Sequence, residues 1–121
     1  MSDKLIYLAS PYSHPDLTLR TIRFHSVCRV AGILMSRGEF VYSPIAHTHP
    51  IAEVMDLPTG WEYWARYDEL IIRRCDLMYV LTIDGWDTSV GVQAEIEIAH
   101  LQAMPIIYVD ANGKEENSNS S

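Results

Sequence analysis

Short apolar segments alternate along the chain with longer segments that repeat apolar residues at helical spacing. The short segments are almost continuously apolar, which is typical of strands buried on both faces of a parallel sheet. They lie at residues 4–9, 39–43, 77–83 and 106–109. Helical spacing fills the intervals, at residues 16–37, 62–74 and 89–104. This alternation predicts an α/β fold, a parallel sheet with helices on both faces and the first strand near its centre.

Capping and turn residues mark the expected ends of the first helix. Ser13, with Asp16 three residues later, resembles a capping box, and Pro15 suits a first helical turn. Arg37 and Gly38 provide a basic last turn and a glycine stop. We therefore expect the chain to enter this helix shortly after the first strand.

Two regions lack the pattern of a helix or a strand. Residues 44–61 contain three prolines and a glycine, so we expect a long loop there, with a single helical turn around residues 51–55. Residues 111–121 carry almost no apolar side chains and cannot offset their ordering entropy by burial. The sequence thus predicts one domain over residues 1–110 and a disordered tail over residues 111–121.

Charge and apolar content narrow the range of partners. The net charge of −7 and the pI near 5.0 disfavour binding to a nucleic acid polymer, which depends on many basic side chains. A single nucleotide remains compatible, because a helix N-terminus and one arginine can hold a phosphate. No apolar segment reaches the length of a bilayer span, so we expect a cytoplasmic protein with no membrane partner. Cys28 and Cys75 lack the neighbouring ligands of a zinc site and are interpreted as buried thiols.

Polar and aromatic side chains follow three of the predicted strands, at the point where each strand ends. The carboxyl ends of parallel strands share one edge of the sheet, where ligands collect in such folds. These side chains are therefore expected to surround a pocket. They are Ser10, Tyr12, Ser13 and His14 after the first strand, Ser43, His47 and His49 after the second, and Asp84, Trp86, Asp87, Thr88 and Ser89 after the third.

Several of these residues have a structural interpretation as well as a functional one. Ser13 either caps a helix or contacts a ligand. Tyr12 and Trp86 either stack on a planar base or pack against the core. His47 and His49 either form hydrogen bonds within a loop or, with a third donor, ligate a metal. The sequence leaves these alternatives open.

Charged residues in the helices are similarly ambiguous. Asp68 and Glu69 are adjacent and cannot both face inward, and their spacing does not select one of them. Arg20 and Arg23 are either exposed or close enough to reach a phosphate. Glu95 lies about one turn into the helix that follows the third strand, where it either faces the pocket as a nucleophile or points to solvent.

Three motifs together resemble the nucleoside 2-deoxyribosyltransferase superfamily. They are the segment Tyr7–Tyr12, the aspartate Asp68 eight residues before Asp76, and the segment Ser89–Glu95. Within that superfamily the chain is most similar to the small 2'-deoxynucleoside 5'-monophosphate N-glycosidases and to a little-characterised bacterial and phage branch. The resemblance implies a flavodoxin-like three-layer sandwich with a parallel sheet of four to five strands. It also implies a homodimer or a larger homo-oligomer.

The same resemblance implies an activity and a set of site residues. The expected reaction is cleavage or exchange of the N-glycosidic bond of a nucleoside or nucleotide, without a metal or an organic cofactor. Glu95 corresponds to the nucleophile, and Asp68 to the residue that positions the sugar and assists proton transfer. A non-catalytic module that binds a nucleotide or an ADP-ribose-like ligand is the alternative. The expected substrate-binding residues are Tyr7, Ser10, Tyr12, Ser13, His47, Asp84, Trp86, Ser89 and Gly91, of which Tyr7 and Ser89 are candidate donors to Glu95.

Overall fold

The four predicted strands form one parallel sheet. In the computed structural model, which describes residues 3–116, they are β1 (Leu5–Ala9), β2 (Phe40–Tyr42), β3 (Leu77–Leu81) and β4 (Ile106–Val109). Their order is β2-β1-β3-β4, and every neighbouring pair is parallel. The first strand thus occupies a central position, as its continuous apolar sequence predicted.

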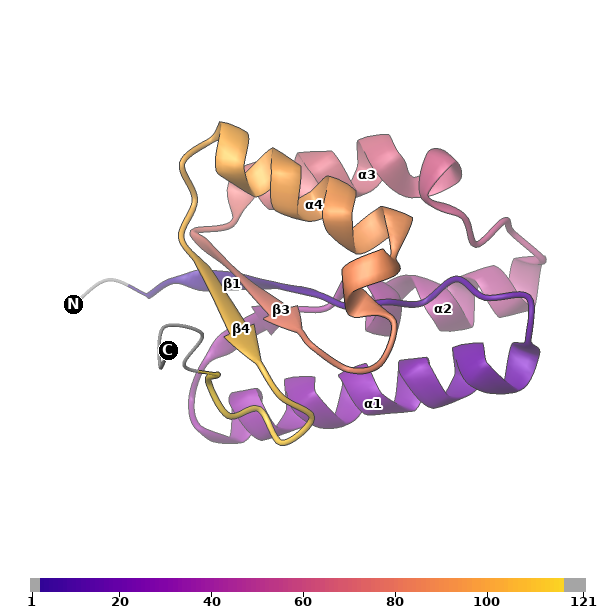
Figure 1. The fold of residues 1–121 in the computed structure, drawn as a ribbon, viewed down its shortest axis with the longest axis horizontal. Helices are drawn as coiled ribbons and strands as arrows, with labels where there is room; N and C mark the ends of the chain where they lie inside the picture. The colour runs from indigo at the N-terminus through magenta and orange to yellow at the C-terminus, as the bar shows by residue number, and fades with distance from the viewer. Residues whose placement is uncertain (1–2, 117–121) are drawn as a thin grey trace.

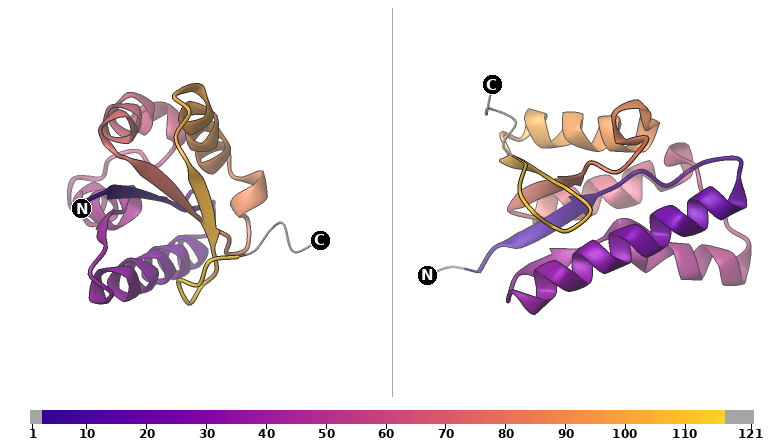
Figure 2. Two further views of the ribbon diagram at one scale, coloured as in Figure 1. Left: turned by 90° about the vertical axis from the view of Figure 1, so that its left-hand side faces the viewer. Right: turned by 60° about the horizontal axis from the view of Figure 1, so that its bottom comes forward.

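Helices cover both faces of the sheet and give the molecule three layers (Figure 1). The helices α1 (Leu17–Ser36) and α2 (Pro44–Met55) lie on one face, and α3 (Trp61–Arg74) and α4 (Val90–Leu101) lie on the other. Figure 2 shows the same layers from the end of the sheet. The predicted α/β, flavodoxin-like fold is confirmed. Within residues 3–116, no helix combines the length and the apolar character that crossing a membrane requires.

Successive residues of the central strands point into different layers. Leu8 is fully buried in the cluster formed with α1, together with Leu34 and Leu81. Tyr7 is also fully buried, but in the opposite cluster, which includes Val92 of α4. This alternation is the period of two that every strand imposes on its side chains. It directs Tyr7 into the layer that contains the first turns of α4.

The N-terminus of α1 differs from the prediction in one respect. The cap is Asp16, whose carboxylate accepts a hydrogen bond of 2.9 Å from the amide of Thr18. Ser13 lies before the helix and donates instead to the carbonyl of Thr59, at 2.6 Å. The capping-box interpretation of Ser13 is therefore wrong, because the chain turns into the helix three residues later than that motif requires.

The expected loop at residues 44–61 contains a twelve-residue helix, α2. Ser43 caps it by accepting from the amide of Ala46 at 3.1 Å, and Pro44 occupies the first turn, where no amide donor is needed. Pro50 removes one hydrogen bond inside the helix. Packing of α2 against α1 and β1 outweighs that loss. The prediction of a loop was wrong because it treated Pro44 and Pro50 alike as residues that prevent a helix, although proline is well tolerated in the first turn.

Residues 111–116 form a turn and a bridge after β4. The Asp110 carboxylate accepts from the amides of Asn112 and Lys114, at 2.8 and 3.0 Å, and so closes a tight turn. Glu115 then pairs with Val109 in an antiparallel bridge. The prediction of a disordered tail is therefore wrong for residues 111–116. The rest of that predicted tail, residues 117–121, lies outside the described residues.

Candidate active site

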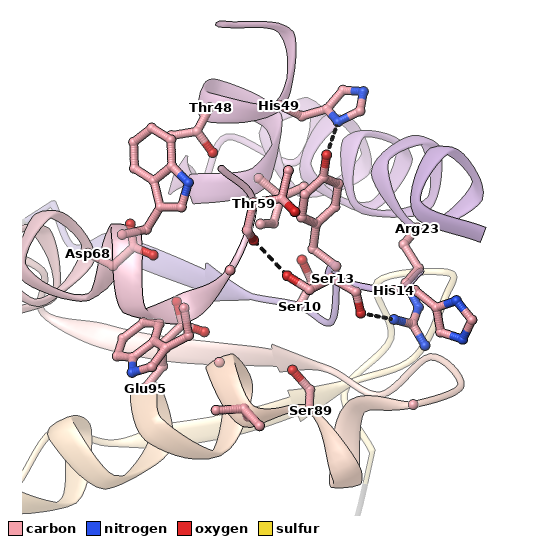
Figure 3. Close-up of a pocket in the computed structure, with 18 of the residues that line it drawn as sticks. Ser10, Ser13, His14, Arg23, Thr48, His49, Thr59, Asp68, Ser89 and Glu95 are labelled. Atoms are coloured by element: carbon pink, nitrogen blue, oxygen red, sulfur yellow. Dashed lines mark hydrogen bonds between the residues drawn. The ribbon is translucent and has the colours of Figure 1, made fainter. Parts of the chain in front are cut away.

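A pocket of about 640 Å3 opens at the carboxyl ends of the strands. Its walls come from the loops after β1, α2 and β3, from α1 and α2, from the first half and the middle of α3, and from the first two turns of α4. Figure 3 shows Asp68 and Glu95 at one end of this pocket and His14 and Arg23 at the other. The pocket is therefore acidic at one end and carries a guanidinium group at the other.

Two buried carboxyl groups define the acidic end. Glu95 is 4% exposed and comes from the second turn of α4, while Asp68 is 6% exposed and comes from the middle of α3. Tyr7 donates its hydroxyl hydrogen to Glu95 Oε2 at 2.5 Å from the strand behind the pocket. Asp68 Oδ1 has no hydrogen-bond partner among the residues that the structure describes. An unpartnered buried carboxylate oxygen that lines a pocket is available to a ligand.

Burial changes the proton affinity of this pair. It raises the pKa of Glu95 from 4.5 to about 8, against the lowering effect of the Tyr7 hydrogen bond, and the nearby Asp68 charge adds to the rise. Burial also raises the pKa of Asp68 to about 7. Burial and the charges of both carboxylates raise the pKa of Tyr7 well above 10, so Tyr7 keeps its hydrogen and remains a donor. Both carboxyl groups therefore titrate near neutral pH and not at about pH 4.

Five of the predicted substrate-binding residues line the pocket directly. They are Ser10, Tyr12, Ser13, Ser89 and Gly91. Ser89 does not bond to Glu95, because its hydroxyl oxygen caps α4 by accepting from the amide of Val92 at 3.2 Å. Tyr7 lies behind the pocket and reaches it only through Glu95.

Three predicted residues lie outside the pocket lining. His47 faces Tyr67, with a distance of 3.2 Å between its Nε2 and the phenol oxygen. Trp86 packs against Tyr108 and the core, which is the structural alternative for this residue. Asp84 contributes only its carbonyl, which lies 3.5 Å from Arg23 Nη2. The position of a residue after a strand therefore does not by itself tell whether its side chain points into the pocket.

Several pocket residues were not among the expected substrate-binding residues, although His49 was expected to lie near a pocket. They come from α2 and from the start of α3, and they are Ile45, Thr48, His49, Ala52, Trp61 and Trp64. The four residues from α2 follow the spacing i, i+3, i+4 and i+7, which is the signature of one helix face. This signal was present in the sequence and was hidden by the interpretation of the segment as a loop.

Arg23 connects two loops at the other end of the pocket. Its guanidinium donates to the carbonyl of Ser13 at 3.1 Å and approaches that of Asp84 at 3.5 Å. Gly85, with φ of 95°, lies against this group, and a Cβ atom at that position would be 2.3 Å from Arg23 Nη2. A glycine at residue 85 therefore allows both the left-handed turn and the close approach of the arginine. Of the two alternatives for Arg23, the structure supports a position in the pocket wall.

The two histidines considered as metal ligands have separate partners. His47 faces Tyr67, whereas His49 bonds to the Tyr12 hydroxyl and stacks on Phe24. Within the described part of the chain, no group of three or more His, Cys, Asp or Glu side chains has the arrangement of a metal site. Although both residues lie on α2, their side chains thus contact different neighbours.

The protein is a small α/β protein whose pocket lies at the carboxyl ends of a parallel sheet and contains two buried carboxyl groups. A pocket in this position is typical of a site for a small polar molecule. Residues 4–110 match the family described as a domain of unknown function, DUF1937, and the chain belongs to this family. A search of curated proteins finds no match.

Among solved structures, the chain is similar to the 2-deoxyribosyltransferase of the psychrotolerant bacterium Bacillus psychrosaccharolyticus. The TM-score is 0.57 and the identity 21%, and the match covers 93% of this chain and 77% of that one. This similarity confirms the nucleoside 2-deoxyribosyltransferase-like fold that the three sequence motifs implied.

Proposed function

We propose that this protein cleaves or exchanges the N-glycosidic bond of a nucleoside or nucleotide, with Glu95 as the nucleophile and Asp68 as its acid/base partner. The observation that supports this proposal most directly is the Tyr7–Glu95–Asp68 arrangement. It places two buried carboxyl groups against a pocket large enough for a nucleoside, and a phenol holds one of them in place. The structurally similar protein is a 2-deoxyribosyltransferase, which is consistent with this chemistry.

The first step forms a bond between a Glu95 carboxylate oxygen and the anomeric carbon of the sugar. The glycosidic C–N bond breaks, its electron pair goes to the base nitrogen, and the base takes up a proton. In the second step, water or a second base attacks the anomeric carbon from the other side and displaces Glu95. Attack by water also releases a proton, which a carboxylate of the pair accepts. No net oxidation occurs in either step.

Asp68 and Tyr7 together determine which of the two carboxyl groups, Glu95 or Asp68, carries a proton. The reactive state has an ionised Glu95, stabilised by the Tyr7 hydroxyl, and a proton on Asp68. Because the pKa of Glu95 is raised to about 8 and that of Asp68 to about 7, the single proton must move from Glu95 to Asp68 before attack. Asp68 Oδ1 is the group free to receive or deliver that proton and to bind a sugar hydroxyl. Activity should therefore require that the pair hold one proton, which gives a bell-shaped pH profile. The homo-oligomer that the resemblance implied and the cytoplasmic location that the short apolar segments predicted remain predictions.

Base release from a substrate panel tests the proposal. The wild type and Glu95→Gln are incubated with deoxyribonucleosides, ribonucleosides and their 5'-monophosphates, and the free base is measured by chromatography. We expect release by the wild type only, and a second base added to the reaction separates transfer from hydrolysis. Ligand binding without release by the wild type would instead identify a nucleotide-binding module.

The Tyr7→Phe variant should change the pH dependence of the reaction. Loss of the hydroxyl removes the interaction that lowers the pKa of Glu95, so ionisation of Glu95 should require a higher pH. We expect the acidic limb of the profile of kcat/KM to move up by about one pH unit. Tyr63→Phe, on the exposed side of α3, is the matched control. An unchanged acidic limb in Tyr7→Phe would contradict the assigned role of the phenol.

A further inference from the structure

The face of α2 that lines the pocket carries one hydroxyl group, that of Thr48, and its hydrogen is already used. Figure 3 shows Thr48 and His49 on this helix, across the pocket from Ser89. The Thr48 hydroxyl donates to the carbonyl of Pro44 at 2.8 Å. Its oxygen therefore retains lone pairs but has no hydrogen to offer a ligand. Thr48 is an acceptor toward the pocket.

The hydrogen of the Tyr12 hydroxyl is also used in a hydrogen bond within the protein. It bonds to His49 Nδ1, while the other ring nitrogen, Nε2, lies 3.5 Å from a carboxylate oxygen of Glu53. A hydrogen on Nε2 faces that carboxylate favourably, whereas a lone pair there would repel it. In the neutral ring, Nδ1 is then the acceptor, and Tyr12 must be the donor. The Tyr12 oxygen is left with lone pairs only.

Two further donors on this side of the pocket are also occupied. Ser13 donates to the carbonyl of Thr59 at 2.6 Å, and the Trp64 indole donates to the carbonyl of Pro58 at 2.9 Å. Ile45 and Ala52 supply apolar surface beside them. Beside this apolar surface, which suits a flat ring, the hydroxyls of Tyr12, Thr48 and Ser13 thus have lone pairs but no free hydrogen for a ligand. The Ser10 hydroxyl, which has no partner among residues 3–116, is a separate pocket group that can donate.

We propose that the wall formed by Tyr12, Thr48 and Ser13 selects a heterocyclic base that carries an exocyclic amino group, as adenine and cytosine do. This inference rests on the proposed function, because Glu95 and Asp68 fix the sugar at the other side of the pocket. An amino group supplies the hydrogens that the wall lacks. An oxo group in its place would bring two acceptors together and leave both unpaired, so hypoxanthine and uracil are disfavoured.

Matched substrate pairs test this selection. The kcat/KM of the wild type is measured for 2'-deoxyadenosine against 2'-deoxyinosine and for 2'-deoxycytidine against 2'-deoxyuridine. We expect the amino member of at least one pair to be favoured about tenfold or more. Tyr12→Phe, which keeps the ring and removes the acceptor, should reduce this ratio severalfold. Tyr63→Phe, outside the pocket, should leave it unchanged.

A binding measurement separates this inference from the proposed reaction. Quenching of Trp61 and Trp64 fluorescence by the same four nucleosides reports affinity without turnover, since both side chains line the pocket. Selective binding of the amino member without base release would support the selection and contradict only the glycosidase proposal. Base release with equal or reversed preference in both pairs would overturn the selection alone. Binding of none of the four nucleosides would also overturn it.

Discussion

Replacement of Glu95 by alanine should reduce base release by roughly 10³-fold or more, and added azide or formate should restore part of it. The alanine removes the carboxylate that attacks the anomeric carbon and leaves a space beside it. A small anion that enters this space can attack in its place. The product would then be the glycosyl azide or formate with an anomeric configuration opposite to that of the covalent intermediate's hydrolysis product.

The matched control lies two residues farther along the same helix. Glu97 is exposed, so Glu97→Ala changes the same residue type without reaching the pocket, and it should keep wild-type turnover. Initial rates of both variants, with and without azide, together with chromatographic identification of the sugar product, make the comparison. Full activity of Glu95→Ala would remove Glu95 from the nucleophile role.

At pH 8.5 the Glu95→Gln variant should have a higher free energy of unfolding than the wild type. At pH 5 the two proteins should differ little in this free energy. Because the pKa of Glu95 is raised to about 8 in the folded state, the native protein binds more protons than the unfolded chain between about pH 4.5 and 8. Stability therefore falls as the pH rises through this window. A rise from 4.5 to about 8 corresponds to a free energy on the order of 5 kcal/mol. The uncharged glutamine avoids this loss.

Urea unfolding at pH 5, 7 and 8.5 measures the effect. The wild type should lose several kcal/mol of unfolding free energy between the first and last of these values, and Glu95→Gln should lose much less. Glu97→Gln should follow the wild type, because its side chain is exposed in both states. Parallel curves for the wild type and Glu95→Gln would show that the buried carboxyl does not carry this charge penalty.

The sequence predicted the sheet better than the site. The strands at residues 5–9 and 106–109 were recognisable because burial on both faces leaves a continuous apolar run. For Glu95 the spacing left both the pocket and solvent open, and the resemblance of the segment Ser89–Glu95 to a family motif singled it out. The structure places Glu95 against the pocket, and its role as the nucleophile stays a prediction. The proposed partner Tyr7 was named as a candidate donor, and the structure shows that contact directly.

The errors concern features that local sequence does not determine. The helix α2 forms because its packed face outweighs Pro50, and that balance depends on α1, which is distant in sequence. His47 and Trp86 belong to the same strand exits as the pocket residues, but they turn toward Tyr67 and Tyr108. Side-chain direction at a strand exit depends on the shape of the whole edge. Only the assembled fold supplies it.

The position of Tyr7 couples the acidity of the pocket to the packing of the core. This side chain is fully buried in the layer beneath α3 and α4, and its hydroxyl is the direct donor to Glu95. Phenylalanine at residue 7 keeps the ring in the core but removes the donor, and a smaller side chain with a hydroxyl leaves a cavity. Packing of this layer and support of the Glu95 carboxyl group therefore depend on the same tyrosine.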